Sequence, residues 1–416
     1  MNVLPPCHEG DTLSLDPQLR DVVRAALFRL QRLLKPRNEL LREGEGGIQI
    51  QNLVGTVDLG HGRTLEIIPK TRPGDDWITS VVALLTGAET LDVAGDRAAG
   101  ATPLRLGLLE SLAAIYADRL ERAVRRDGPI TTMERQAVRS ETLSGKLDAE
   151  RWARTAPLHP GIFPVQVNRL SAENDFSRVL SHVAARFART SRRTITRLRL
   201  ARASGALRPG MSEEVIAPPG GELKVLPPQW SAYQPAWSIA CALLGRRSLL
   251  GPEGAHAGVS VAVEPWPLLE TLLDRSLRSA ALQASAAGRS LRAEPQWRLQ
   301  LLSAAGGTAR ARPPIAPDGV LFEDDRIFAV FDAKYRDYVE RDGPKRTEIY
   351  QVITAARAAG ASIAVLAYPG NHGAAWWNVG PEPGNPVRLA TIGLRMFSYR
   401  PGGEAERGRE LLELVS

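Results

Sequence analysis

The feature that most constrains the fold is a pair of short apolar runs near the C-terminal end of the chain. Residues 319–322 and 327–331 are apolar, and the polar residues 323–326 separate them. Two apolar runs of strand length joined by a polar turn predict a β-hairpin. Antiparallel pairing would then bring Asp318, before the first strand, beside Asp332, at the end of the second. The sequence therefore predicts two neighbouring carboxylates at the open end of a hairpin.

A lysine follows the second carboxylate at strand spacing. Because side chains alternate between the two faces of a strand, Asp332 and Lys334 should point to the same side. Two carboxylates suit Mg²⁺, which prefers oxygen ligands, and the Ala333 carbonyl offers a further oxygen. Metal-dependent phosphodiester cleavage uses such a metal together with a cationic group. The alternative is a solvent-facing hairpin whose acids merely end its strands, but buried charges are costly unless they are paired or metal-bound.

A helical pattern upstream carries another carboxylate. Residues 266–277 have helical periodicity, and Glu270 shares an apolar face with Leu273 and Leu277. A carboxylate on such a face needs a partner, and a metal or the lysine of the hairpin would serve. The open alternative is a glutamate at the boundary of the face that reaches solvent and pairs with Arg275.

Further elements are predicted around the hairpin. They are a strand at 297–301, a helix from 347 to about 359 with Gly360 as its C-terminal cap, a buried strand at 362–368 and a last strand at 389–396. The predicted order is one helix, three strands, a second helix, then one or two strands. An alternation of this kind indicates an α/β fold.

The first half of the chain has different patterns. It contains an amphipathic helix at 18–35, short strands between 48 and 68 with a turn at 60–62, helices at 77–85 and 104–125, and a long helical pattern at 179–203. The last pattern is rich in arginine: Arg186, Arg189, Arg192, Arg193, Arg197, Arg199 and Arg202. This basic face would either follow DNA phosphates or form a solvated or partner-facing surface.

These patterns predict a multidomain α/β protein. Residues 1–250 would form one region, β-rich at 45–70 and helical at 77–205, and residues 251–416 would form a C-terminal domain. The glycine-rich and poorly periodic stretch 249–263 is the candidate boundary. A chain of 416 residues is long enough for two or three domains with cores of their own.

Composition excludes several classes of protein. The formal net charge of +7 suits a polyanionic partner. The two cysteines, Cys7 and Cys241, form neither a disulfide framework nor a zinc motif. No apolar run approaches the length of a membrane span, so a cytoplasmic protein with no membrane contact is expected. No phosphate-loop pattern occurs, so the chain is not expected to bind GTP or ATP itself.

The C-terminal residues resemble the PD-(D/E)xK nuclease superfamily. Its signature is matched by Pro317–Asp318 together with Asp332, Ala333 and Lys334. Glu270 is similar to the acid that many members carry on the first core helix, and Gln351 to the glutamine on the helix after the lysine strand. This resemblance implies a restriction-endonuclease-like core, in which helices flank a mixed sheet. It also implies a catalytic set of Asp318, Asp332, Lys334, Glu270 and Gln351, with the metal held by the three acids and the Ala333 carbonyl.

Longer segments of the chain show which family within this superfamily the chain resembles. Seven segments, at residues 47–55, 65–70, 145–148, 163–180, 332–335, 350–351 and 366–369, resemble in order those of McrC, the nuclease subunit of modified-cytosine restriction systems. The chain departs from that family at Ala355, where members often carry tyrosine, and at Leu269, where they usually carry phenylalanine. Neither position is one of the expected metal ligands.

The resemblance implies both an activity and a partner. It predicts a Mg²⁺-dependent endonuclease subunit that cuts double-stranded DNA carrying modified cytosine after activation by an McrB-like AAA+ GTPase. The N-terminal region would contact that GTPase. The alternative is a non-cleaving adaptor or activator of the GTPase that retains a nuclease fold.

Overall fold

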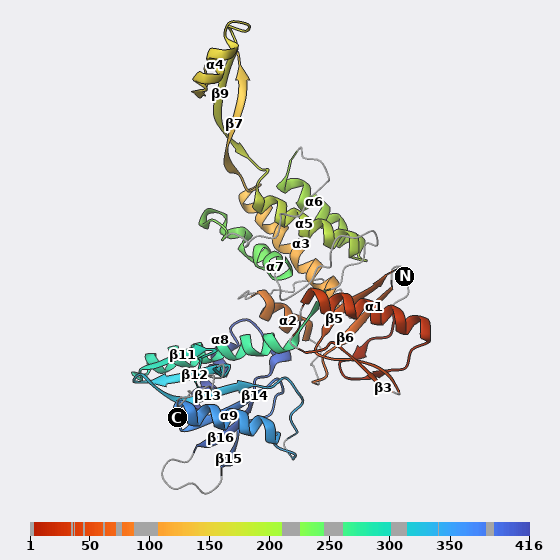
Figure 1. The fold of residues 1–416 in the computed structure, drawn as a ribbon, viewed down its shortest axis with the longest axis vertical. Coiled ribbons are helices and arrows are strands. Elements are labelled where there is room, and N and C mark those ends of the chain that lie inside the picture. Colours follow the sequence, from red (N-terminus) through yellow and green to blue (C-terminus); the bar gives the residue numbers. More distant parts are fainter. Residues whose placement is uncertain are drawn as a thin grey trace, which may run out of the picture. The chain divides into compact units, whose positions relative to one another are not determined.

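A computed structural model describes most of the chain as two compact units (Figure 1). The first unit combines Met1–Ser111 with Ala242–Ser416, and the second is Leu112–Cys241. The described residues are 4–34, 36, 38–44, 46–60, 63–71, 77–86, 107–209, 225–244, 261–300, 314–339, 341–379 and 387–416.

A six-stranded mixed sheet forms the C-terminal part of the first unit. Its strand order is β11-β12-β13-β14-β16-β15. The parallel pairs are β13 with β14 and β14 with β16, and the other neighbours are antiparallel. The strands are β11 (Leu291–Pro295), β12 (Gly319–Glu323), β13 (Arg326–Ala333), β14 (Ile363–Tyr368), β15 (Ala375–Asn378) and β16 (Arg388–Gly393).

The predicted hairpin is confirmed as β12 and β13. The strands pair with Gly319 opposite Phe331 and Glu323 opposite Arg326. Asp324 and Asp325 form the two-residue turn, and both have positive φ values, 47° and 64°. Positive φ at both central positions is the geometry whose twist matches a right-handed hairpin, and aspartate tolerates it better than most residues. A register shift between Leu321 and Phe322 adds one unpaired residue to β13, and the turn and this shift together place Asp318 beside the end of β13.

Helices cover both faces of this sheet. Val320 and Val330 pack in one buried core with Val352 of α9 (Arg346–Ala359). On the opposite face, a Cβ added to Gly319 would lie 2.4 Å from Leu277 Cδ1 of α8 (Pro265–Ala286). Because neighbouring strand residues point to opposite faces, α8 and α9 flank the sheet from its two sides. The predicted helix at 347–359 is confirmed, and Gly360 caps it in the left-handed conformation.

One predicted strand is misplaced, and three elements that follow the hairpin were not predicted. The strand expected at 297–301 is instead β11, which ends just before Gln296, where φ is +49°. Leu299 makes only an isolated bridge to Ile315, and residue 301 lies outside the described residues. A positive φ interrupts strand geometry. The alternation of apolar and polar residues in the sequence does not predict where such a φ occurs. The unpredicted elements are β15, η2 (Met396–Ser398) and α10 (Glu404–Val415).

The N-terminal part of the first unit contains two small sheets. One has the order β1-β6-β5-β10 and the other β2-β4-β3. The strands are β1 (Cys7–His8), β2 (Thr12–Leu13), β3 (Leu41–Gly44), β4 (Gly47–Ile50), β5 (Val54–Gly60), β6 (Arg63–Ile68) and β10 (Val261–Val263). The amphipathic helix α1 (Pro17–Leu34) buries Leu27 and Leu30 in a core with Ile50 and Leu65. The predicted helix and strand set are confirmed, whereas residues 61–62 of the predicted turn lie outside the described part.

Strand β10 changes the division of the chain. It pairs antiparallel with β5, with Val261 opposite Thr56, although it lies beyond the predicted boundary at residue 250. A Cβ on Gly55 would lie 2.3 Å from the Val261 carbonyl oxygen, so glycine allows this close approach. Residues 249–260 of the predicted boundary lie outside the described residues. The compact first unit therefore contains both the N-terminal sheets and the large sheet, unlike the predicted division into 1–250 and 251–416.

The second unit is helical with a long two-stranded ribbon. Strands β7 (Thr132–Ser140) and β9 (Phe163–Ser171) pair over nine residues, and Figure 1 shows the ribbon reaching out from the helices of its unit. The short β8 (Lys146–Leu147) also pairs with β9. The helices are α4 (Ala149–Thr155), α5 (Asp175–Thr190), α6 (Thr194–Leu207), η1 (Pro228–Tyr233) and α7 (Gln234–Leu244). The division between the two units falls within α3 (Leu108–Asp127) and within α7, and α2 (Trp77–Thr86) belongs to the first unit.

The predicted helix at 179–203 is wrong as a single element. The chain leaves helical geometry at Ser191, which has φ −61° and ψ 135°, and α5 and α6 pack against each other. The buried side chains explain the break, because those of α6, such as Thr196 and Leu200, are out of phase with Val183 and Phe187 of α5. A straight helix could not bury both sets on one face.

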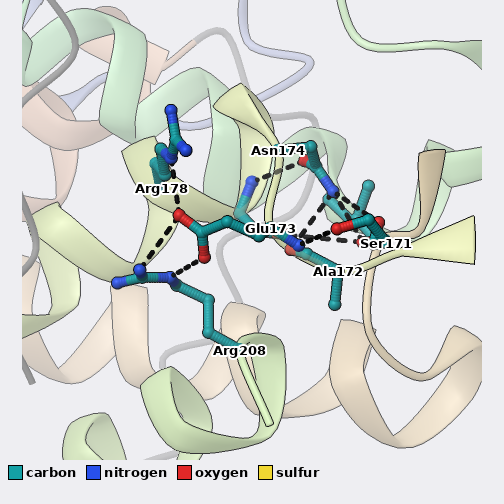
Figure 2. A network of polar contacts seen from close by, with 8 residues as sticks. Ser171, Ala172, Glu173, Asn174, Arg178 and Arg208 are labelled. Atoms are coloured by element: carbon teal, nitrogen blue, oxygen red, sulfur yellow. Dashed lines mark hydrogen bonds and ion pairs between the residues drawn. The ribbon is translucent and has the colours of Figure 1, made fainter. Parts of the chain in front are cut away.

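A network of polar contacts fixes the start of α5 (Figure 2). Asn174 caps the helix by accepting a hydrogen bond from the Ser177 backbone at 3.0 Å. Glu173 accepts from Arg178 at 2.6 Å and from Arg208, beyond the end of α6, at 2.8 and 3.0 Å. These arginines lower the pKa of Glu173 in spite of its burial. The network thus ties the two helices together at the base of the ribbon.

Candidate active site

The structure brings the two predicted aspartates together at the open end of the hairpin. Asp318 directly precedes β12, and the strand pairing places it opposite Asp332 near the end of β13. The backbone N–H of Ala333 donates to Asp318 Oδ2 at 2.7 Å. Both carboxylates are nearly buried, with 9% of Asp318 and 4% of Asp332 exposed. The predicted proximity of the two acids is therefore present.

Lys334 lies between the second aspartate and the predicted glutamine. Its Nζ is 2.6 Å from Asp332 Oδ2 and donates to Gln351 Oε1 of α9 at 2.9 Å. The backbone N–H of Lys334 donates to the Ala367 carbonyl of β14 at 2.8 Å, which fixes the chain as it leaves β13. The site thus joins Asp318, Asp332, Lys334 and Gln351 from three elements.

The electrostatics of the site centre on Asp332. Burial is the main cause that raises the pKa of its carboxyl; Lys334 lowers this pKa, the negative charge of Asp318 raises it, and the net value is about 6. Two buried carboxylates so close repel each other when both are ionised, and a single ammonium compensates only part of that charge. A divalent cation would relieve the repulsion.

The donor set fits a hard cation such as Mg²⁺. Two carboxylates and the Ala333 carbonyl supply oxygen ligands, and Mg²⁺ commonly takes few protein ligands and keeps several waters. In the part of the chain that the structure describes, no three acidic, histidine or cysteine side chains gather at one metal position. A metal here would therefore rest mainly on the two aspartates and the carbonyl.

Glu270 lies on α8, the predicted helix that packs against one face of the six-stranded sheet. It lies half-buried on α8, two turns before Leu277, whose side chain packs against Gly319. The absence of a three-acid cluster in the described chain means that Glu270 does not join both aspartates in one such group. A role for Glu270 as a metal ligand stays a prediction.

Two features of the site were missed by sequence reasoning. Gln296 donates from Nε2 to Asp318 Oδ1 at 3.0 Å, from a residue with positive φ. Arg336 forms a two-pronged ion pair with Glu348 of α9, at 2.7 Å in both bonds. Glu348 lies three residues after Lys345, the spacing of a capping box at the start of α9, which was an available signal. Gln296 left no such signal.

Fold and site together define the chain as an α/β protein with paired carboxylates and a lysine at the end of a hairpin in a mixed sheet. Comparison with known families then makes the assignment specific. The chain belongs to the family of McrBC 5-methylcytosine restriction system components, whose model matches residues 48–369.

A solved structure shares the fold of this chain. The chain is similar to a chain of the refined half-complex from the tetradecameric assembly of Thermococcus gammatolerans McrB AAA+ hexamers with bound McrC. That similarity has 17% identity, a TM-score of 0.67 and full coverage of both chains. A chain of the cryo-EM structure of the Thermococcus gammatolerans McrBC complex matches at 19% identity and a TM-score of 0.47, over 66% of this chain and 88% of that one. A comparison with curated proteins finds no match.

Proposed function

We propose that the chain is the Mg²⁺-dependent endonuclease subunit of a GTPase-driven restriction system, with a PD-(D/E)xK site. The observation that carries the proposal is the convergence of Asp318, Asp332 and Lys334, with Lys334 Nζ 2.6 Å from Asp332. Membership in the McrBC family supports the biological setting, and a restriction function on DNA fits the cytoplasm. The bond cleaved would be a phosphodiester of DNA carrying modified cytosine.

The residues of the site would divide the work. Asp318, Asp332 and the Ala333 carbonyl would hold Mg²⁺, with Glu270 as a further candidate. When bound, Mg²⁺ offsets charge on the scissile phosphate and makes an attacking water more acidic. Lys334 would exchange its contact with Asp332 for one with the phosphate or the water. Its ammonium would stay in the site because it also donates a hydrogen bond to Gln351. Gln296 would orient Asp318 by its hydrogen bond to Oδ1.

The proposed partner is an McrB-like AAA+ GTPase. The related structure contains McrC bound to McrB AAA+ hexamers, and this chain has no phosphate-loop sequence of its own. Within the described part of the chain, no helix has the length and apolarity needed to cross a bilayer. Residues 1–250 would contact the GTPase, and the β7–β9 ribbon offers exposed apolar side chains for such a contact, among them Met133 and Leu170.

The test is cleavage of DNA carrying modified cytosine in the presence of the GTPase partner, GTP and Mg²⁺. Wild-type protein should cut, and Asp332→Ala should not cut while it still binds the partner. A matched control is Asp325→Asn, which alters a carboxylate at the far end of the same hairpin and should leave cleavage unchanged. Cleavage by Asp332→Ala at the wild-type rate would show that the site is misassigned. Absence of cleavage by the wild type, together with stimulated GTP hydrolysis, would favour the adaptor function.

A further inference from the structure

The three residues that follow β13, namely Lys334, Tyr335 and Arg336, contact different elements of the fold. Lys334 donates to Gln351 and Arg336 pairs with Glu348, both on α9. Between them, the Tyr335 hydroxyl donates at 2.8 Å to Glu9 Oε2, in the N-terminal part of the same compact unit. The chain that carries the active-site lysine is therefore held on one side by α9 and on the other by the N-terminal sheet.

Glu9 is a buried carboxylate with both oxygens engaged. Its side chain has no exposed surface, and Oε1 accepts from the Asn52 backbone at 2.8 Å and from Lys70 Nζ at 3.2 Å. Tyr335 supplies the donor for the other oxygen. Removing one partner of a buried charge leaves that charge uncompensated. The Glu9 carboxylate and its three donors, the Asn52 backbone N–H, Lys70 and Tyr335, therefore depend on one another. We refer to Glu9, Lys70 and Tyr335 as the linkage cluster.

The tyrosine ring is fixed as well as its hydroxyl. Lys70 Nζ lies 4.7 Å from the centre of the Tyr335 ring, a cation–π geometry, and the ring meets Phe397 edge-on at 6.4 Å. Lys70 ends the segment 65–70, and Tyr335 ends the segment 332–335. Both segments carry the sequence resemblance to the McrC family, and they meet at this point although 265 residues separate Lys70 from Tyr335.

We propose that Tyr335 is a positioning residue for cleavage, through which Glu9 and Lys70 of the N-terminal sheet hold Lys334 in register with Asp332. This inference rests on the proposed function. Lys334 and Tyr335 share a peptide bond, so a shift of the tyrosine moves the lysine relative to the metal ligands. A misplacement of about 1 Å in a catalytic group costs on the order of a hundredfold in rate.

The test uses the full chain with its GTPase partner and single-turnover cleavage, with the enzyme at saturating concentration and in excess over DNA. Tyr335→Phe removes the hydroxyl and keeps the ring contacts, and Glu9→Gln keeps the shape of the acceptor and removes its charge. Each variant should slow the cleavage step by roughly tenfold to a hundredfold. The stimulation of GTP hydrolysis should stay at the wild-type value, because the partner hydrolyses GTP and Lys334 takes no part in that reaction.

A double variant and a matched control separate positioning from general destabilisation. Tyr335→Phe combined with Glu9→Gln should be no slower than the slower single variant, since both remove the same contact. Tyr338→Phe is the control, because its hydroxyl contacts Thr391 of β16 rather than the linkage cluster. It should cut at the wild-type rate.

Hydrogen exchange at the Lys334 amide gives a readout that does not need cleavage. This amide donates to the Ala367 carbonyl, and its exchange should be faster in Tyr335→Phe but unchanged in Tyr338→Phe. The inference is overturned if folded Tyr335→Phe cuts at the wild-type rate, or if its Lys334 amide exchanges as in the wild type. If wild-type protein and Asp332→Ala are equally inactive, the proposed function fails instead, and the exchange experiment alone decides whether the linkage cluster fixes the strand end.

Discussion

The Nζ of Lys334 lies 2.6 Å from Asp332 Oδ2, so the ammonium forms a close ion pair with one of the two carboxylates proposed to hold the metal. The same ammonium donates to Gln351 at 2.9 Å, which gives it a second partner. Metal binding to Asp332 would therefore leave Lys334 still held over the site. This relationship separates the role of the lysine from the roles of the aspartates.

Replacing the lysine should abolish cleavage without weakening metal binding. In Lys334→Ala, Asp332 loses a competitor for its carboxylate, so calorimetry should give Mg²⁺ affinity equal to or tighter than that of the wild type. Lys334→Arg should not restore cleavage, because a planar guanidinium cannot reproduce a compact ammonium at 2.6 Å. Weaker Mg²⁺ binding by Lys334→Ala would contradict this division of roles.

Neutralising Asp332 should stabilise the metal-free protein. Its carboxyl pKa is raised to about 6 by burial and by Asp318, so the fold favours the protonated acid. That contribution is fully present below the unfolded pKa and is lost as pH rises through about 6. Asp332→Asn should thus raise the free energy of unfolding at pH 8 in EDTA by roughly 1–3 kcal/mol.

The pH and metal dependence supply the control for this prediction. As pH falls well below the unfolded pKa of about 3.9, the difference between Asp332→Asn and the wild type should disappear, because the wild-type carboxyl is then protonated in both states. Added Mg²⁺ should stabilise the wild type more than the variant. A variant that is less stable than the wild type at pH 8 without metal would show that the Asp332–Lys334 ion pair outweighs the cost of burying the carboxylate.

The ion pair between Arg336 and Glu348 should be needed for stability. Both side chains are largely buried, and the Tyr368 hydroxyl also donates to Glu348, at 2.9 Å. Glu348→Gln should lower the free energy of unfolding by about 3 kcal/mol, because it leaves the guanidinium of Arg336 buried without its counter-charge. A matched control is Glu294→Gln, which breaks the exposed pair with Arg292 and should cost less than about 1 kcal/mol. Urea denaturation measures both.

The same pair should make stability depend on pH in the acid range. Burial alone would raise the pKa of Glu348, but hydrogen bonds from Arg336 and Tyr368 outweigh it and lower the pKa below its ordinary value. A lowered folded-state pKa gives stability that is present above the unfolded pKa and is lost as pH falls through the folded pKa. The difference in unfolding free energy between the wild type and Glu348→Gln should therefore shrink as pH falls below about 4.3. A constant difference across this range would contradict the cause assigned to the shift.

The second unit should contact the GTPase partner by itself. It is compact over Leu112–Cys241, whereas a fragment of residues 1–250 would lack β10 and leave β5 with an unpaired edge. A fragment of residues 112–241, with native helix content by circular dichroism, should bind the partner and raise its rate of GTP hydrolysis. Leu170→Asp, which places a charge on an exposed apolar position of the ribbon, should weaken that binding. A folded fragment that neither binds nor stimulates would place the contact in the first unit.

The sequence by itself determined the local parts of the candidate site. Two apolar runs around Asp324 and Asp325 specified the hairpin and brought Asp318 close to Asp332, whereas the final register also depends on a shift in the pairing between Leu321 and Phe322. Helical periodicity and Gly360 specified α9 and its end. These features depend on neighbours within a few residues, and local periodicity reports such neighbours directly.

Only the tertiary structure decided which distant residues complete the site. Tyr335 meets Glu9 across 326 positions of sequence, and β10 joins β5 across a predicted boundary. Gln296 donates a hydrogen bond to Asp318, and its own backbone has a positive φ that no sequence pattern predicts. Contacts of this kind join single polar groups or short strands, which have no period of their own. Their partners are set by how the chain buries its apolar faces and satisfies the polar groups left inside, and that balance is fixed only when the whole unit folds.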